Sequence, residues 1–125
     1  MPDANDPMRN RPYSFVRAHR RRLGLTQTEL AALLGIESST TVSRIERSVR
    51  RPTAPNVLAY SVLFGVPASE LFASLHGQIK DGVAVAAKRL YDELEHKGDK
   101  PSLRKREFLD QVLVRVANSN QSEKV

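Results

Sequence analysis

Arginine is concentrated in one third of the chain, and its side-chain chemistry suggests a partner. Between Arg9 and Arg51 ten arginines stand against three glutamates, a net charge of +7, whereas the rest of the 125 residues sums to −1. All six lysines lie at or beyond Lys80. A planar guanidinium can hold a phosphate or a guanine edge with two parallel hydrogen bonds, which a lysine ammonium cannot. The distribution indicates an acidic polymer as partner rather than an ordinary solvated basic face.

Residues for catalysis or metal binding are sparse. The chain has no cysteine, which excludes disulfides, thiolate zinc sites and cysteine nucleophiles and fits a reducing, intracellular compartment. The three histidines are isolated, and there is no glycine-rich phosphate loop. The carboxylate cluster of Asp92, Glu93 and Glu95 follows Lys88 and Arg89, as expected of ordinary helix surface. We therefore expect no enzyme activity, no metal and no cofactor.

Length and apolar patterning bound the type of protein. The chain is long enough for about one domain. Its longest apolar stretch, residues 57–66, is half of the roughly 20 residues needed to cross a bilayer. The first residues lack the apolar segment of a secretion signal. The sequence predicts a soluble, cytoplasmic protein that does not bind membranes.

Apolar residues recur at helical spacing from residue 13 to residue 75, with no strand-like alternation. Gly24 and Gly35 mark two helix ends, and Thr26 with Glu29 has the spacing of a capping box between them. Further helices are predicted from about Ser39 to Arg47, from Pro55 to Gly65 and in a short segment, residues 67–75. The helix at 55–65 is apolar nearly all round, which favours a core helix.

Two amphipathic stripes follow in the C-terminal part. Val83, Ala87, Leu90 and Leu94 repeat at 4, 3 and 4 residues, which predicts a helix that a polar break at residues 97–101 ends. A last helix, which Ser102 can cap, carries the second stripe: Phe108, Leu109, Val112, Leu113 and Val116. These stripes either form a dimer interface or pack on the N-terminal helices.

One set of residues follows a known pattern of positions: Arg20, the segments 24–27, 29–31, 34–36, 42–47 and 51–52, and the segments 63–66 and 70–72. On these residues the region of about 13–75 resembles the lambda-repressor/Cro-like (Xre-type) helix-turn-helix family. The resemblance implies a five-helix lambda-repressor-like DNA-binding domain. Followed by the two C-terminal amphipathic helices that the stripes predict, this domain gives an all-α fold. The boundaries expected are a flexible tail at 1–12, the helix-turn-helix domain at 13–76, the helical extension at 77–118 and a second flexible tail at 119–125.

The resemblance also implies which residues contact double-stranded DNA. The third helix, Ser39 to Arg47, corresponds to the element that enters the major groove. By family position, Ser39, Thr40 and Arg44 would read base edges, and Gln27 would bind phosphate. A phosphate contact is the alternative for Arg44. The remaining expected contacts come from the same helix and the loop after it: Ser38, Thr41, Ser43, Arg47, Arg50 and Arg51.

Other family positions have a structural meaning. Arg20 and Glu46 fall where family members form an ion pair, with a DNA contact as the alternative for Arg20. His19 stands where the family prefers an apolar residue and is expected to be half-buried. The chain is one residue longer than the family pattern near residues 37–40. Which residues of the third helix contact bases is therefore open by one position. Ser48 replaces a favoured glycine, and we expect this helix to end differently.

The sequence thus predicts a sequence-specific double-stranded DNA-binding transcription regulator, in the form of a repressor that acts as a homodimer on a palindromic operator. RNA is disfavoured because no aromatic residue is evident for base stacking. The alternative is an antitoxin or anti-activator that binds a protein partner through its C-terminal helices and also its own promoter. The dimer would form through apolar residues of the two stripes: Val83, Leu90, Leu94, Leu109, Val112 and Val116.

Overall fold

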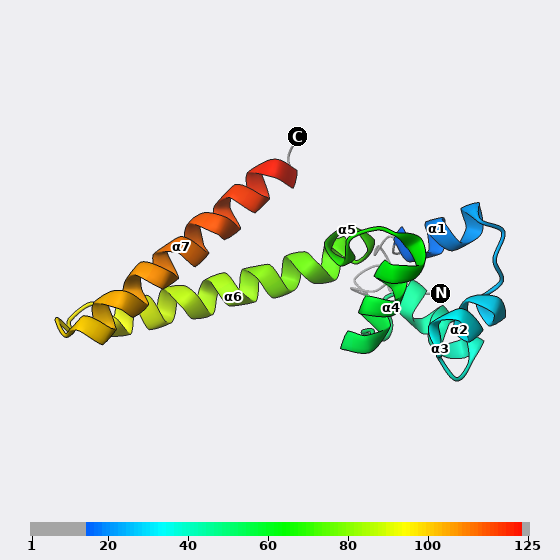
Figure 1. Cartoon of the computed structure of the whole chain (residues 1–125), viewed down its shortest axis with the longest axis horizontal. Helices are drawn as coiled ribbons and strands as arrows, with labels where there is room; N and C mark the ends of the chain where they lie inside the picture. The colour runs from blue at the N-terminus through cyan, green and yellow to red at the C-terminus, as the bar shows by residue number, and fades with distance from the viewer. Residues whose placement is uncertain (1–14, 124–125) are drawn as a thin grey trace, which may run out of the picture. The chain divides into compact units, whose positions relative to one another are not determined.

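The computed structural model describes residues 15–123 as seven helices and contains no strand within that range, so the predicted all-α fold class is confirmed (Figure 1). The chain divides into two compact units, the first ending at Ser74 and the second beginning at Leu75. The predicted tail at 1–12 lies outside the described residues. The helices are α1 (Phe15–Arg22), α2 (Gln27–Leu34), α3 (Ser39–Glu46), α4 (Ala54–Phe64), α5 (Ala68–Leu71), α6 (Ala73–Leu94) and α7 (Lys100–Glu123).

Local signals in the sequence begin and end the first helices. The hydroxyl of Thr26 accepts the N–H of Glu29 at 3.0 Å, and the Glu29 carboxylate accepts the N–H of Thr26 at 2.9 Å, so the capping box is confirmed. The backbone N–H of Thr26 holds the pKa of Glu29 below its usual value. Gly24 and Gly35 have φ of 74° and 70°, the left-handed conformation that ends helices without strain at glycine.

The core of the first unit gathers side chains from five helices. Its fully or almost fully buried apolar residues are Val16, Leu30, Ala31, Val42, Ile45, Tyr60 and Leu71. The ring of Tyr60 meets Phe72 edge-on with centroids 5.3 Å apart, and it lies 6.1 Å from the ring of Phe64. The contact with Phe72 joins α4 to the segment around α5, whereas Phe64 belongs to α4 itself.

Helix α4 is less buried than its composition predicts. Of its residues only Tyr60 is buried, while Leu58 and Val62 are 65% and 84% exposed. The expectation of a core helix is therefore wrong. In a unit of five short helices α4 turns one side to the core, so Leu58 and Val62 on the other side stay in solvent while Val57 and Phe64 are half-buried.

The second unit is a hairpin of α6 and α7. Ala87, Leu94 and Leu109 form its buried core, against which Tyr91, Val112 and Leu113 pack. Leu94 and Leu109, expected at a dimer interface, instead hold together the two helices of one chain. The hydroxyl and the N–H of Ser102 both donate to the Asp99 carboxylate, at 2.7 and 3.2 Å. Asp99, rather than Ser102, thus accepts the capping hydrogen bonds at the start of α7.

The lengths of the later helices differ from those expected. The predicted helix at 67–75 is α5, only four residues long, and α6 then runs without a break from Ala73 to Leu94. The expected boundary at residues 76–77 lies two residues beyond the division between the two units, and both positions fall inside α6, where Gly77 keeps a helical conformation. At the C-terminus, α7 continues to Glu123, so residues 119–123 are helical where a flexible tail was expected.

Candidate nucleic-acid interface

Helix α3 is held in place by a charged group at its last residue. The Glu46 side chain is 1% exposed and accepts from the Nε and Nη2 of Arg20 at 2.6 and 3.0 Å. Arg20 also donates from Nη1 to the backbone carbonyl of Leu25 at 2.8 Å. Gln27 donates from Nε2 to Glu46 at 3.2 Å. One carboxylate therefore joins α1, the start of α2 and the end of α3, and the predicted ion pair is confirmed.

The two sides of α3 differ sharply. Val42 and Ile45 are buried at 0% and 2% exposure, as predicted for anchors to the core. Thr40, Arg44 and Arg47 are exposed and recur at i, i+4 and i+7, which places them along one ridge of the helix. Ser39, Thr41 and Ser43 are half-buried beside this ridge. The helix thus presents to solvent a face of hydroxyl and guanidinium groups.

The first residue of α3 is defined by its cap. Ser38 has an extended backbone, and its hydroxyl accepts the N–H of Thr41 at 3.4 Å. The helix therefore begins at Ser39, and Ser38, an expected DNA contact, has a capping role as well. The turn from α2 to α3 occupies residues 35–38. Four residues are enough to hold α2 and α3 as two helices packed directly on each other.

The end of α3 departs from the expectation. Ser48 has φ of +60°, so a serine adopts the left-handed conformation for which the family favours glycine. The N–H of Ser48 donates to the carbonyl of Ile45 at 3.1 Å and that of Val49 to Arg44 at 2.9 Å, the two bonds of a Schellman motif. The helix ends as it would with glycine, because these hydrogen bonds offset the backbone cost at Ser48.

A comparison with protein families identifies this arrangement. Residues 16–71 match the family model described as Helix-turn-helix. This segment is a helix-turn-helix domain of the lambda-repressor/Cro-like type. The match covers α1 to α5, and the domain type is that of DNA-binding transcription regulators. A search of the curated proteins and of the solved structures finds no match to the chain.

The remaining expected contact residues lie around α3 of the helix-turn-helix domain. Gln27 is the first residue of α2, and its bond to Glu46 links it to the end of α3. Arg47 donates from Nε to the carbonyl of Ser43 at 3.4 Å. Arg50 and Arg51 are exposed in the loop between α3 and α4. The bond between Gln27 and Glu46 was not expected, because no local spacing relates two residues 19 positions apart.

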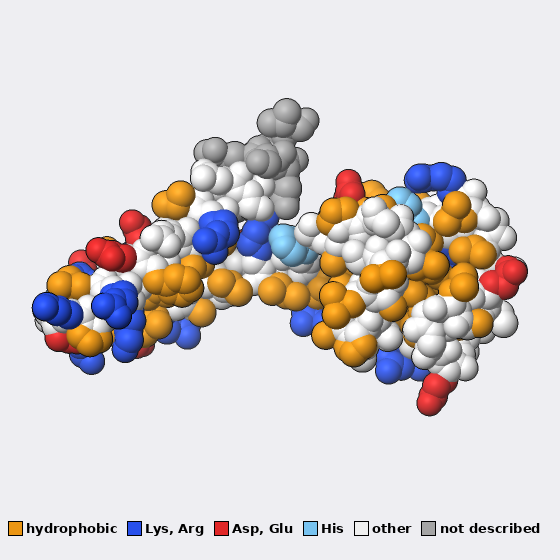
Figure 2. Space-filling model, viewed as in Figure 1, with side chains coloured by type: hydrophobic (Ala, Val, Ile, Leu, Met, Phe, Trp, Pro, Cys, Tyr) orange, Lys and Arg blue, Asp and Glu red, His pale blue; other side chains and the backbone are white. Residues whose placement is uncertain are grey.

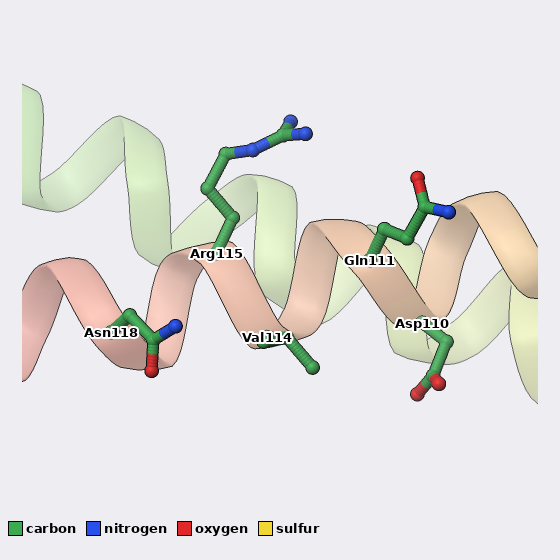
Figure 3. A pocket seen from close by; sticks show the side chains of 5 residues that line it. All are labelled: Asp110, Gln111, Val114, Arg115 and Asn118. Atoms are coloured by element: carbon green, nitrogen blue, oxygen red, sulfur yellow. The ribbon is translucent and has the colours of Figure 1, made fainter.

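Other features of the chain bear on alternative sites. The half-buried ring of His19 stacks on Phe64 at 5.5 Å within the helix-turn-helix domain, in keeping with the expected structural role. The described part of the chain holds no group of three or more histidine, aspartate or glutamate side chains that could bind a metal. Across the described residues, no helix combines the length and apolar character needed to span a membrane. A shallow hollow on α7 is lined by that helix alone (Figure 3).

Proposed function

We propose that the protein is a sequence-specific double-stranded DNA-binding transcription regulator that acts as a dimeric repressor on a palindromic operator. The observation that carries this proposal is the exposed ridge of Thr40, Arg44 and Arg47 on a helix whose opposite side is anchored by Val42 and Ile45. An α-helix fits the major groove, about 12 Å wide, and offers its exposed side chains to base edges there.

Base recognition would come from the exposed and half-buried residues of α3. Arg44 is the only long donor at the centre of the ridge, and its two parallel N–H groups match the O6 and N7 atoms of guanine. Thr40 and Ser39 are shorter and can accept or donate one hydrogen bond each. Arg44 would therefore supply the main sequence preference, with the hydroxyl groups of Ser39, Thr40, Thr41 and Ser43 adding to it.

Phosphate contacts would orient this helix in the groove. The side-chain amide nitrogen of Gln27 carries two N–H groups, and its hydrogen bond to Glu46 needs only one of them. The second N–H could reach a phosphate while the first remains on Glu46. Arg50 and Arg51, exposed after the end of α3, would bind phosphates further along the strand. Such contacts carry affinity and orientation rather than sequence preference.

Two copies are proposed because one helix-turn-helix reads only a few base pairs. Two symmetry-related domains roughly double the specific free energy and favour half-sites about 10 bp apart, or a multiple of this, on one face of the duplex. A dimer bound over a promoter in this way would compete with RNA polymerase, which is the basis for proposing a repressor. The C-terminal hairpin would hold the two copies together.

Selection of binding sites from a pool of random duplexes tests the proposal on the full-length chain. The expected result is a palindromic consensus with one preferred G·C pair in each half-site. A reporter driven by a promoter that contains the selected site should then lose expression when the protein is present. Recovery of duplexes without any shared sequence would contradict specific recognition, and increased reporter expression would contradict repression.

A further inference from the structure

The hairpin of α6 and α7 is built on a regular seam. The residues of α6 that face α7 are buried or half-buried and follow one another at 4, 3, 4 and 3 residues: Lys80, Ala84, Ala87, Tyr91 and Leu94. This is the a/d spacing of a helical bundle. The two helices are antiparallel, because Lys80 donates to the Ser119 hydroxyl at 3.2 Å near one end and Arg106 to the Glu95 carbonyl at 3.3 Å near the other.

A second apolar stripe on α6 has the same spacing but no cover within its own unit. It consists of Ile79, Val83, Ala86 and Leu90, each one residue before a seam position, and we call it the α6 stripe. Ile79, Val83 and Leu90 are 53%, 48% and 42% exposed. Figure 2 shows hydrophobic side chains (orange) exposed along the hairpin. The α6 stripe thus leaves about three turns of apolar helix surface in solvent.

Helix α7 adds to the same side of the hairpin. Phe108 and Val112 each precede a seam residue, Leu109 and Leu113, just as the residues of the α6 stripe precede theirs. In an antiparallel pair, positions with the same offset from the seam lie on the same side. Phe108 is 58% exposed and Val112 is half-buried. The α6 stripe and these two residues form one continuous surface, which we call the apolar face.

The opposite side of the hairpin has a different character. Val85 and Val114 are exposed there among acidic residues of both helices, namely Asp81, Asp92, Glu107 and Asp110. Asp92 also pairs with Lys88 across one turn of α6 at 3.0 Å. On α7, Asp110 and Arg115 point to opposite sides of the helix (Figure 3). These four acidic residues thus lie away from the apolar face, whereas Glu93, one residue before Leu94, lies on the side of that face.

We infer that the apolar face packs on the same face of a second copy of this chain and makes a four-helix bundle. In an isolated hairpin each helix has one neighbour and needs one stripe, whereas in a four-helix bundle each helix contacts two. The hairpin buries only three apolar side chains almost fully, which is a small core for two helices of this length. A second stripe on α6 supplies the contact surface that a bundle requires.

The charge of the face selects a second copy as the occupant. A two-fold interface places a surface against itself, so any charge near the axis meets its own kind. The residues of the α6 stripe, with Phe108 and Val112, are all uncharged, whereas the opposite side would bring acidic residues together. At the same offset from the seam lie Glu93, before Leu94, and Arg115, before Val116. These two charges have opposite signs and can pair between copies, so the apolar face remains self-complementary. This inference rests on the proposed two-copy function and names the surface through which the copies join.

Sedimentation of the full-length chain without DNA tests the interface. Wild type and Val85→Glu, which changes the acidic side, should sediment as dimers. The combined Val83→Glu and Leu90→Glu variant should raise the dimer dissociation constant about 30-fold or more, because each copy would then bury two carboxylates in the interface. Circular dichroism should show unchanged helix content. A monomeric wild type would overturn the inference, and so would an equal loss of dimer in Val85→Glu. Loss of the dimer in Val62→Glu, on the exposed side of α4, would overturn it as well, because the interface would then lie in the first unit.

Cysteine cross-linking keeps the test valid if the glutamate variants unfold, since the chain has no cysteine of its own. Ala86→Cys lies in the α6 stripe, and Val85→Cys, its neighbour, lies on the acidic side. A short bis-maleimide should join two copies through position 86 but not through position 85. Equal cross-linking at both positions, or none at position 86, would overturn the inference.

Failure of this interface and failure of the proposed function give different results. If the glutamate variant is monomeric, it should still bind a duplex with one half-site as wild type does, while its affinity for the full palindrome falls. A wild type that is monomeric yet selects a palindrome would overturn the inference and leave the proposed function intact. A dimer that is held by this face but shows no preference among duplexes would contradict the proposed function alone.

Discussion

Arg20 and Glu46, 26 positions apart in the chain, form a two-pronged ion pair that ties α1 to the last residue of α3. The Arg20 side chain is 11% exposed and that of Glu46 1%. The hydrogen bonds to the Glu46 carboxylate, with its negative charge as a smaller cause, raise the pKa of Arg20. This pair, with Gln27, sets the orientation of α3 relative to the two helices before it.

Arg20→Ala should lower the free energy of unfolding by about 3 kcal/mol, because it leaves the buried Glu46 carboxylate without its main partner. Urea denaturation measures this loss. The matched control is Arg21→Ala, an exposed neighbour on α1, whose effect should stay within about 0.5 kcal/mol. Replacing both partners, Arg20→Met with Glu46→Leu, should cost less than Arg20→Ala alone. Unchanged stability with lost DNA binding would assign Arg20 to DNA instead.

Ser48→Gly should raise the free energy of unfolding by about 1 kcal/mol. Ser48 has φ of +60°, and glycine adopts this conformation without the steric cost that a side chain brings. Thermal unfolding followed by circular dichroism checks the gain. Ser48→Ala is the control, because alanine keeps the Cβ atom and should bring no gain. A loss of stability in Ser48→Gly would mean that the serine hydroxyl stabilises the end of α3.

Tyr60→Phe should leave stability at neutral pH unchanged or raise it by about 1 kcal/mol. Tyr60 is fully buried, and its hydroxyl has no hydrogen-bond partner among the described residues, so its removal ends a desolvation cost. Urea denaturation at pH 7 measures the difference. A loss above about 1 kcal/mol would show that the hydroxyl makes a stabilising hydrogen bond.

The same substitution should change the response to alkali. Burial, with the Glu46 charge as a smaller cause, raises the pKa of Tyr60 above the value of about 10 that it has in an unfolded chain. Titration of Tyr60 therefore leaves the free energy of unfolding unchanged below about pH 10. Above this pH it lowers the free energy of unfolding by up to about 1.4 kcal/mol per pH unit. Tyr60→Phe should remove this part of the fall. Identical pH profiles for both proteins would contradict it.

Arg44→Ala should remove one strongly preferred G·C pair from each half-site and weaken binding to the selected operator by about 1–3 kcal/mol. The reason is that Arg44 is the exposed long donor at the centre of the α3 ridge. Repeating the site selection with the variant measures the change in consensus. Uniformly weaker binding to the same consensus would assign Arg44 to a phosphate. Arg22→Ala, exposed on α1, is the control for a general loss of charge.

Arg50→Ala combined with Arg51→Ala should weaken binding without changing the consensus. Both residues are exposed in the loop after α3, and each phosphate contact that is lost lowers the slope of log K against log[salt] by about 0.9. Titrations at several salt concentrations measure the slope for wild type and variant. A shifted consensus with an unchanged slope would make the loop a reader of bases.

Much of the first unit was predictable because its signals are local. The capping box of Thr26 and Glu29 and the left-handed glycines at 24 and 35 depend on residues a few positions apart, so the sequence shows them directly. Val42 and Ile45 alternate with polar residues at helical spacing, which predicted the buried side of α3. Family position, rather than spacing, predicted the pair of Arg20 and Glu46.

Only the tertiary structure decided how apolar side chains are shared among competing surfaces. Composition alone made α4 a core helix, but its burial depends on how many neighbours the fold supplies, and Leu58 and Val62 remain exposed. The stripes on α6 and α7 predicted contact without saying with what: Leu94 and Leu109 join one chain's two helices, while Val83 and Leu90 stay in solvent. Helical periodicity defines a face, but the partner of that face depends on contacts between residues far apart in sequence.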